Sequence, residues 1–314
     1  MNLPASNATA LIRARGLTKT FGERTAVDAI NFDVRDGEFF GFLGPNGAGK
    51  TTTMRMIAGV SPRTAGTLEI LGSDPDKDGP RIRGQLGVVH QQETLDQELT
   101  VRENLLIFGR FFGIARNEIA ERADQLLELF QLSDRAKDQV EPLSGGMKRR
   151  LSIARSLINA PRVLMLDEPT TGLDPQARHL LWDALQRLKR SGTTIVLTTH
   201  YMDEAEQLCD RLVVMDQAKI VAEGSPRQLI EEHASREVLE LRFSEGTSHI
   251  SKEALDGIGD RYERLAERVI IGCENGEAAH ARALEHGLAP ESWLVRRSSL
   301  EDVFLRMTGR SLDE

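Results

Sequence analysis

Residues 39–58 read FFGFLGPNGAGKTTTMRMIA. The first five of these residues form an apolar run that predicts a buried strand, and the last five suit a helix. Between them, the pattern Gly44-x-x-x-x-Gly49-Lys50-Thr51 is typical of a phosphate-binding loop in its strand–loop–helix context. The glycines allow consecutive backbone N–H groups to converge on phosphate oxygens, and the helix that follows adds the positive end of its dipole.

Two residues at the end of this loop give it its chemistry. Lys50 is expected to place its ammonium group on the β- and γ-phosphates of a nucleotide, and the Thr51 hydroxyl is expected to ligate Mg²⁺. A glycine-rich turn with an incidental lysine is the alternative interpretation. The strand and helix patterns on either side favour the phosphate loop.

Composition sets broad limits on the protein. Its 314 residues are enough for a sizeable core and suggest two domains, and a 40% apolar, 28% charged composition is ordinary for a globular protein. A net charge of −8 disfavours a protein that wraps nucleic acid, so no nucleic-acid partner is predicted. Cys209 and Cys273 match no metal spacing and are interpreted as ordinary thiols in a reducing compartment. No apolar run reaches roughly 18 residues, so no segment is expected to span a membrane.

The order of segments predicts an α/β domain at residues 10–233, with a mostly parallel sheet covered by helices on both faces. Within it, residues 100–160 are expected to form a helical insert and residues 72–80 a polar loop. Thr100 and Glu103 suit a capping box at the start of the insert. The strands expected are residues 11–14, 30–34, 39–43, 66–71, 87–89, 163–166, 193–198 and 211–215. Further helices are expected at residues 147–158, 176–190, 202–209 and 226–232.

Residues 234–314 change period and predict a small α+β domain. This region has no glycine-rich loop and no ligand cluster of its own, so a regulatory or assembly role is expected. The strands predicted are residues 238–243, 269–273 and 293–296, and the helices are residues 252–258, 278–286 and 300–308.

A hydrophobic strand at residues 163–166 ends in two acids, Asp167 and Glu168. The carboxyl ends of strands in an open α/β sheet are where ligands bind, so these acids should lie beside the phosphate loop. There Asp167 can hold Mg²⁺, directly or through its waters, and Glu168 can polarise an attacking water. Acids also end strands as helix caps, but the phosphate loop earlier in the chain favours the catalytic interpretation.

Two further patterns carry weaker signals. Ser144-Gly145-Gly146 precedes a helix and could bind an anion, although an ordinary helix cap is favoured for the tripeptide by itself. His200 follows a β-rich run, where a neutral imidazole could hydrogen-bond a γ-phosphate or its attacking water. A capping or surface histidine is the alternative, and its expected place at the same sheet edge as Lys50 argues against that alternative.

These pieces in this order resemble the nucleotide-binding subunit of an ATP-binding-cassette (ABC) transporter. The resemblance covers about residues 10–225 and implies a P-loop NTPase cassette with a RecA-like, mostly parallel sheet core, an antiparallel β subdomain and a helical subdomain. It also implies an ATPase that uses ATP with Mg²⁺. The matching segments are the Walker A loop at residues 44–51, the signature at residues 143–147, the Walker B strand at residues 163–168 and the switch histidine at His200.

Three more positions acquire roles from the resemblance. Phe21 looks like the aromatic residue that stacks on adenine, where many members carry tyrosine. Gln91 looks like the Q-loop glutamine that touches Mg²⁺ and couples to the membrane subunit. The preceding His90 stands where family members usually have proline, and the doublet of Gln91 and Gln92 leaves this register open by one residue, although the downstream sequence favours Gln91. Asp174 looks like the D-loop acid at the dimer seam.

The site residues implied by the resemblance fall into three sets. The catalytic set is Glu168, His200 and Gln91. The Mg²⁺ set is Thr51, Gln91 and Asp167. The ATP-binding set is Phe21, Gly44, Pro45, Asn46, Gly47, Ala48, Gly49, Lys50, Thr51, Thr52, Ser144, Gly145, Gly146 and Asp174.

Longer stretches resemble one subgroup of exporters, which works with a six-helix membrane partner. It includes drug-resistance ATPases and nodulation-factor, or lipochito-oligosaccharide, exporter ATPases. The segment LTVRENLLIFGRFFGI (99–114) favours the lipo-oligosaccharide branch, with a drug or another amphipathic lipid as the alternative cargo. The stretches that carry the subgroup are LSGGMKRRLSIAR (143–155), DEPTTGLDPQARHLLWD (167–183), CDRLVVM (209–215) and LEDVFLRMTGR (300–310).

The chain carries one phosphate loop and one signature, so the family mechanism implies a homodimer with ATP held between head-to-tail copies. Residues 144–146 of the second copy would then close over the γ-phosphate. The family places such a subunit peripherally on the cytoplasmic face of the inner membrane, against an integral membrane permease. The competing interpretation is a soluble ABC ATPase that acts on ribosomes, DNA or cofactor assembly. A single cassette, no long coiled coil and the acidic composition disfavour it.

Overall fold

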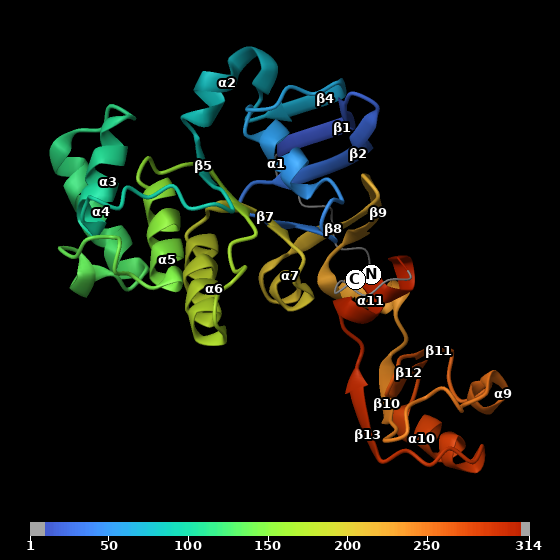
Figure 1. The fold of residues 1–314 in the computed structure, drawn as a ribbon. Coiled ribbons are helices and arrows are strands. Elements are labelled where there is room, and N and C mark those ends of the chain that lie inside the picture. Colours follow the sequence, from blue (N-terminus) through green and yellow to red (C-terminus); the bar gives the residue numbers. More distant parts are fainter. Residues whose placement is uncertain (1–9, 309–314) are drawn as a thin grey trace. The chain divides into compact units, whose positions relative to one another are not determined.

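The computed structural model describes residues 10–308, and Figure 1 labels its helices and strands. The chain forms two compact units, which divide after Glu223. The sequence placed this boundary after residue 233. In the structure α8 (Pro226–His233) packs with α11 (Leu300–Thr308), and this helix pair belongs to the second unit.

The first unit is organised around a six-stranded sheet with the order β5-β6-β7-β3-β8-β9. Neighbouring strands from β5 to β8 run parallel, which confirms the predicted mostly parallel sheet. Every residue of β3 and β6 is buried, as expected for apolar strands between two layers. The strands are β3 (Phe39–Leu43), β5 (Leu86–Val89), β6 (Val163–Asp167), β7 (Thr194–Thr199), β8 (Arg211–Asp216) and β9 (Lys219–Gly224).

A three-stranded antiparallel sheet, with the order β2-β1-β4, packs beside the large one. The sequence predicted short strand segments on either side of a turn at Phe21 and Gly22, and the structure extends them into one long hairpin. Phe32 from this hairpin packs edge-on against Phe42 of the large sheet, with ring centroids 5.0 Å apart. The strands are β1 (Ala10–Phe21), β2 (Arg24–Arg35) and β4 (Ala65–Ile70).

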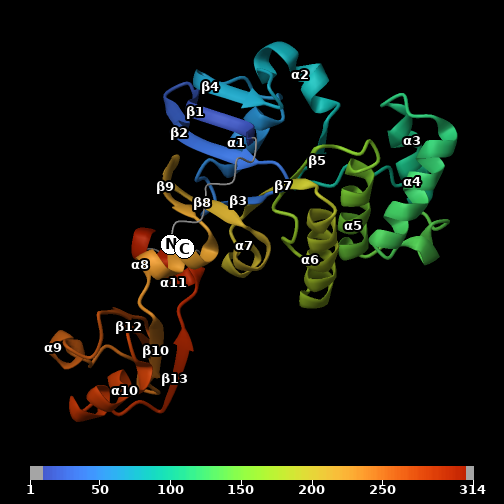
Figure 2. The ribbon, with the colours of Figure 1, turned by 180° about the vertical axis from the view of Figure 1, so that it is seen from behind.

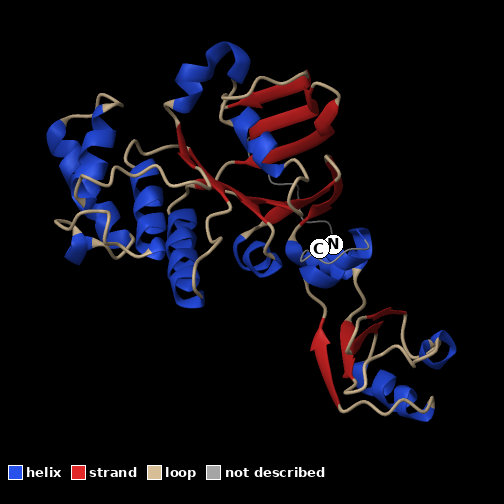
Figure 3. Ribbon diagram, in the orientation of Figure 1, coloured by secondary structure: helices blue, strands red, loops and turns tan. Residues whose placement is uncertain are grey.

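Helices cover both faces of the six-stranded sheet (Figure 3). α1 (Lys50–Ile57) lies between the two sheets, in contact with β2, β6 and β7 (Figure 1). α5 (Gly145–Ser156), α6 (Pro175–Arg190) and α7 (Met202–Leu208) lie on the opposite face, as the reverse view in Figure 2 also shows. This layering brings the carboxyl ends of β3, β6 and β7 to the N-terminus of α1.

The helical insert consists of α3 (Val101–Arg110) and α4 (Arg116–Leu129), which pack on each other and on α5. The predicted capping box is confirmed. The Glu103 N–H donates to the Thr100 hydroxyl oxygen at 3.2 Å, and the Thr100 N–H donates to the Glu103 carboxylate at 2.9 Å. The apolar face of α4 is buried through Ile119, Ala123 and Leu127.

The expectation of a polar loop at residues 72–80 is wrong, because α2 (Pro75–Arg83) occupies most of it. Asp74 caps this helix by accepting a hydrogen bond from a backbone N–H of the first turn at 3.0 Å. Arg63 donates two hydrogen bonds to the same carboxylate, each at 2.7 Å, and they lower the pKa of Asp74 to about 2. Pro75 is tolerated because the first turn of a helix needs no N–H from that position.

The second unit contains a four-stranded antiparallel sheet with the order β11-β12-β10-β13. Three of these strands were predicted. β11 was not, because its residues are polar and lack the alternation of a half-buried strand. Residues 309–310, which end the terminal sequence motif, lie outside the described residues. The elements are β10 (Glu237–Arg242), β11 (Arg261–Arg264), β12 (Arg268–Cys273), β13 (Ser292–Arg297), α9 (Lys252–Leu255) and α10 (Gly276–Glu285).

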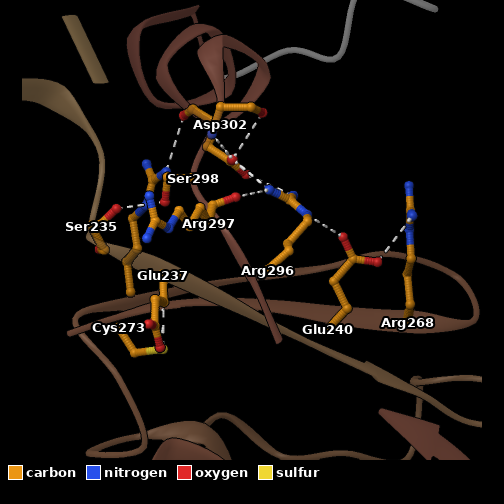
Figure 4. A network of polar contacts seen from close by, with 11 residues as sticks. Ser235, Glu237, Glu240, Arg268, Cys273, Arg296, Arg297, Ser298 and Asp302 are labelled. Carbon is orange, nitrogen blue, oxygen red and sulfur yellow. Dashed lines mark hydrogen bonds and ion pairs between the residues drawn. The ribbon is translucent and has the colours of Figure 1, made fainter. Parts of the chain in front are cut away.

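A chain of ion pairs joins α11 to this sheet (Figure 4). The Arg296 guanidinium donates to both carboxylate oxygens of Asp302, at 2.7 and 2.9 Å, and to Glu240 at 2.8 Å. Asp302 also accepts the backbone N–H of Ser299 at 2.8 Å. Since Asp302 is only 2% exposed, its negative charge depends on these partners.

Candidate active site

The loop between β3 and α1 follows a path that only glycine permits at two positions. A Cβ at Gly44 would lie 2.2 Å from the carbonyl oxygen of Met215. Gly49 has a φ of +105°, and a Cβ there would lie 2.5 Å from the carbonyl oxygen of Ala26. The glycines of the sequence pattern are therefore explained by close backbone contacts.

Lys50 is the first residue of α1, and its side chain folds back into the loop. Its ammonium group donates hydrogen bonds to the carbonyl oxygens of Gly44 at 2.6 Å and Pro45 at 3.1 Å. The same nitrogen lies 3.6 Å from a carboxylate oxygen of Glu168. Burial lowers the pKa of Lys50, while the Glu168 carboxylate opposes this shift. The loop thus encloses a buried amine with one carboxylate partner.

Glu168 directly follows β6 and stands at the centre of the polar contacts. Besides Lys50, it is approached by Gln91, whose amide donates at 3.2 Å, and by His200, whose Nδ1 lies 3.4 Å away. Its φ of +47° is unusual for a residue with a side chain. The Glu168 N–H donates to both the carbonyl and the hydroxyl oxygen of Thr198, each at 3.1 Å, and so holds this conformation in place.

Asp167 is the last residue of β6 and faces the start of α1. One of its carboxylate oxygens accepts hydrogen bonds from the hydroxyl groups of Thr51 at 3.2 Å and Thr198 at 2.5 Å. A carboxylate and a hydroxyl are the oxygen donors that suit Mg²⁺ when phosphates supply the remaining ligands. Among the described residues there is no group of three acidic, histidine or cysteine side chains that would hold a metal by itself. The donor set therefore fits a metal shared with a nucleotide.

A cleft of about 420 Å³ opens beside these residues. It is lined by the loop and the first turn of α1, by Phe21 and Arg24 of the hairpin, and by Gln91 and Glu168. The Phe21 side chain is 55% exposed at the edge of this cleft. A flat apolar group can lie on this ring while a phosphate chain reaches the loop.

The signature residues and Asp174 lie at two other helix starts. Ser144 caps α5 and Asp174 caps α6, each by accepting a hydrogen bond from a backbone N–H of the first turn, at 3.3 and 2.9 Å. Residues 145–146 begin α5, and its first turns line a second cavity of about 220 Å³ together with Gln91 and Glu168. Within one chain the structure therefore groups the predicted catalytic residues, and it leaves the signature at a separate helix terminus.

Arg149 is a contributor that the sequence analysis missed. It lies in α5, and its guanidinium donates to the carbonyl oxygens of His90 at 2.6 Å, Asp167 at 2.8 Å and Pro169 at 2.9 Å. It thereby joins the Q-loop to the segment that carries the two acids. The basic run at residues 148–150 was the available signal, but such a run does not reveal which carbonyls it meets.

Thr198 and Arg24 were also missed. Thr198 contacts both acids, as described above, and Arg24 lines the cleft beside the loop, with a guanidinium nitrogen 3.9 Å from where a Cβ of Gly47 would lie. Threonine is common in strands, so its presence in β7 carried no functional signal.

Comparison with known proteins gives matches in sequence and in structure. The family model described as ABC transporter matches residues 27–171. A protein named Nod factor export ATP-binding protein I from Cupriavidus metallidurans is 45% identical over 309 residues, which cover 97% of this chain and 99% of that protein. A protein of the same name from Mesorhizobium japonicum is 44% identical over 313 residues, covering 100% of this chain and 91% of that protein.

Two solved structures illustrate the structural match. An ATP-binding subunit of an ABC transporter superposes with a TM-score of 0.64 at 29% identity, covering 71% of this chain and 92% of its own. A dimeric ATP-binding cassette in a post-hydrolysis state, bound to ADP and Pi, gives a TM-score of 0.62 at 28% identity, covering 68% and 98%. Together with the phosphate loop and the acids that face it, these relatives identify the chain. It belongs to the ABC transporter family, as an ATP-binding and ATP-hydrolysing subunit.

Proposed function

We propose that this subunit powers the export of a lipo-oligosaccharide of the nodulation-factor type through a separate membrane subunit. The observation that carries the proposal is the 45% identity to a Nod factor export ATP-binding protein, which extends over 97% of this chain. That match includes most of the second unit, residues 224–314, as well as the cassette. An amphipathic drug is the second candidate cargo.

The geometry supports a division of labour among the residues around Glu168. Its carboxylate would polarise the attacking water, with His200 and Gln91 placed to orient that water and the γ-phosphate. Lys50 would compensate the negative charge of the phosphates. Phosphoryl transfer needs mainly positioning and charge compensation, and the distances of 3.2 to 3.6 Å from these three side chains to Glu168 provide such an arrangement.

The nucleotide and its metal would use the remaining predicted residues. The exposed Phe21 ring would hold the adenine, and the backbone N–H groups of residues 44 and 46–52 would donate to the phosphates. Thr51 and Asp167, already 3.2 Å apart, would hold Mg²⁺ with help from Gln91. When bound, the metal neutralises charge between the β- and γ-phosphates.

A complete site is proposed to need two copies of the chain. Residues 144–146 begin a different helix from the one that follows the phosphate loop and do not line the cleft beside that loop, so we assign them to a nucleotide on a partner. The cap position of Asp174, at the start of α6, suits a seam residue. The dimeric form of the related cassette bound to ADP and Pi supports this assembly.

An exposed aromatic patch supports contact with a membrane subunit. We define this patch as Phe108, Phe111 and Phe112, at the end of α3, where Phe111 is 78% exposed. Arg155 lies over the Phe108 ring, 4.9 Å from its centroid, and donates to the carbonyl oxygen of Thr94 at 2.7 Å. The patch is therefore connected to the segment that follows the Q-loop glutamine.

The partner proposed for this patch is a six-helix permease, with the present chain attached peripherally at the cytoplasmic face of the inner membrane. Among residues 10–308, no helix has both the length and the apolar character needed to cross a bilayer. A separate membrane protein would therefore carry the transport path.

A transport assay tests this proposal. The chain would be co-expressed with a candidate six-helix permease, sought first among the neighbouring genes, and reconstituted into inside-out vesicles with ATP and Mg²⁺. We expect uptake of a radiolabelled lipochito-oligosaccharide that is lost in the Lys50→Met variant. Uptake of an amphipathic dye alone would instead favour the drug as cargo. Failure of the chain to co-purify with any membrane protein would favour a soluble ABC ATPase.

A further inference from the structure

Glu204 is a fully buried acid that the proposed mechanism leaves without a role. It lies in α7, four positions after His200, and has no exposed surface. Among the described residues, no lysine or arginine forms an ion pair with it. A carboxyl group in such a place is costly unless it is protonated or well partnered.

Its neighbours come from three separate parts of the nucleotide site. The Trp182 indole, from the helix that Asp174 caps, donates to Glu204 Oε1 at 3.4 Å. The hydroxyl groups of Thr199 and Thr170 also lie against the carboxyl group. Thr199 immediately precedes the switch histidine, and Thr170 stands two positions after Glu168.

The surroundings favour the neutral form of this acid. Burial raises the pKa of Glu204, the hydrogen-bonding groups of Thr199, Thr170 and Trp182 oppose the rise, and the Asp203 carboxylate adds to it. Arg149, a buried cation that interacts electrostatically with Glu204, donates its hydrogen bonds to backbone carbonyls.

Two buried oxygen atoms in this cluster each need a hydrogen-bond partner. Glu204 Oε2 and the Thr170 hydroxyl oxygen are both inaccessible to solvent, and neither has a hydrogen-bond partner that meets strict geometry among residues 10–308. A single hydrogen bond between the carboxyl group and the hydroxyl would satisfy both atoms at once.

We propose that Glu204 is a positioning residue for ATP hydrolysis, whose carboxyl group ties the loop that carries Glu168 to the strand end that carries His200. The inference rests on the proposed roles of those two side chains. Glu168 has a left-handed backbone with a φ of +47°, and such a conformation persists only where the surroundings fix it. Thr198 fixes this backbone from the strand, and Glu204 fixes the loop after it through Thr170. The 3.4 Å distance between His200 Nδ1 and the Glu168 carboxylate depends on both the Thr198 contact and the Glu204 contact.

The test compares five full-length variants with the wild type: Glu204→Gln, Glu204→Leu, Thr170→Val, the double variant Glu204→Leu/Thr170→Val and Glu168→Gln. An exposed acid on the same helix supplies the matched control, Glu206→Leu. Each protein is assayed for kcat and KM of ATP hydrolysis across the physiological pH range. The affinity for a fluorescent ADP analogue and the thermal unfolding midpoint are measured on the same preparations.

We expect Glu204→Gln to keep kcat within about twofold of the wild type with the same pH profile, because glutamine reproduces a neutral carboxyl group. Glu204→Leu should lower kcat at least roughly tenfold with little change in KM or ADP affinity, because the phosphate loop is untouched. Thr170→Val should lower kcat in the same direction, and the double variant Glu204→Leu/Thr170→Val should lose little more. Glu206→Leu should behave as the wild type.

Two results would overturn the inference. One is a normal kcat in both Glu204→Leu and Thr170→Val. The other is a parallel loss of kcat, ADP affinity and thermal stability that glutamine does not rescue, since that pattern marks a purely structural residue. If Glu204→Leu does not fold, Glu204→Gln and Thr170→Val decide the matter alone. Wild-type kcat in Glu168→Gln would instead refute the proposed catalytic role, whatever the Glu204 variants do.

Discussion

Lys50 and Glu168 form an ion pair at the nucleotide cleft, with the ammonium nitrogen 3.6 Å from a carboxylate oxygen and both side chains less than a tenth exposed. The lysine belongs to the helix after the phosphate loop, and the glutamate follows the strand that carries the second acid. The buried ammonium group of the cleft is therefore in direct contact with the proposed general base.

Glu168→Gln is expected to separate binding from hydrolysis. Removing the carboxylate should lower kcat by roughly 100- to 10,000-fold, the usual range for loss of a positioned base. It also removes a negative charge near the phosphates, so ATP affinity should stay the same or increase. Single-turnover hydrolysis and equilibrium binding of a fluorescent ATP analogue measure the two effects, and the conservative exposed change Glu206→Gln is the control. Unchanged hydrolysis would contradict the assignment.

The Gly49 position allows steric clash to be distinguished from backbone strain. In Gly49→Ala the new methyl group would meet the Ala26 carbonyl oxygen at 2.5 Å, at a φ of +105°. Gly192→Ala is the matched control, because its φ is +91° and no atom lies within 4 Å of the new methyl group. Both variants should lose about 1–3 kcal/mol of stability from the left-handed backbone. Only Gly49→Ala should also lose ATP affinity, measured by isothermal titration.

The charge state of Glu204 predicts how stability depends on pH. The pKa of this residue is raised in the folded protein, so its contribution to stability is complete below the ordinary value of 4.5 and is lost as pH rises towards the folded value. Glu204→Gln cannot lose a proton. The thermal unfolding midpoint of Glu204→Gln minus that of the wild type should therefore increase as pH rises from about 4.5. A constant difference across this range would show that Glu204 is ionised in the folded protein.

Much of this site could be read from the sequence, because its chemistry is local. The recognisable patterns are contiguous or closely spaced in the sequence: the phosphate loop, the two acids at the end of β6, and the capping box of Thr100 and Glu103. The supporting contacts are not. Arg149 and Glu204 act through residues distant in the chain or on other elements, and a residue's partners across elements leave no periodic signal. The helix α2 was missed for a different reason: Asp74 and Pro75 are a local start signal, but Gly79 and Pro80 inside the helix are typical of a loop.

Asp302→Asn is expected to weaken the second unit. The aspartate charge accepts hydrogen bonds from Arg296 and the Ser299 N–H, and losing a charged hydrogen bond costs about 1.5–3 kcal/mol of unfolding free energy. Urea unfolding followed by Trp293 fluorescence would measure this loss, with the exposed Glu301→Gln on the same helix as control.

The pH dependence gives a second check on this acid. Burial raises the pKa of Asp302, but hydrogen bonds from Arg296 and Ser299 outweigh it, so the pKa is lowered overall. Its stabilisation is therefore present above the ordinary aspartate value of 3.8 and is lost as pH falls below that value. The difference between wild type and Asp302→Asn should shrink in acid, and a difference that grows there would contradict the assignment.

The aromatic patch makes a prediction about membrane attachment. Phe111→Asp replaces a ring that is 78% exposed with a charged carboxylate. Because the site is on the surface, the fold and the basal ATPase rate should be unaffected. Binding to vesicles that contain the membrane subunit should weaken about tenfold or more, as expected for loss of an aromatic anchor. Val60→Asp, at a residue of the same unit that is 56% exposed, is the control. Equal binding by the two variants would exclude the patch as the contact.

One helix, α5, carries the signature at its first turn and Arg149 a few positions later. The Arg149 guanidinium donates hydrogen bonds to three carbonyl oxygens, in the segment before Gln91 and in the segment around Glu168. In a head-to-tail pair this helix would sense the partner's nucleotide at one end and hold its own chain's loops at the other. Binding of ATP at one site would then change the rate of hydrolysis at the other site.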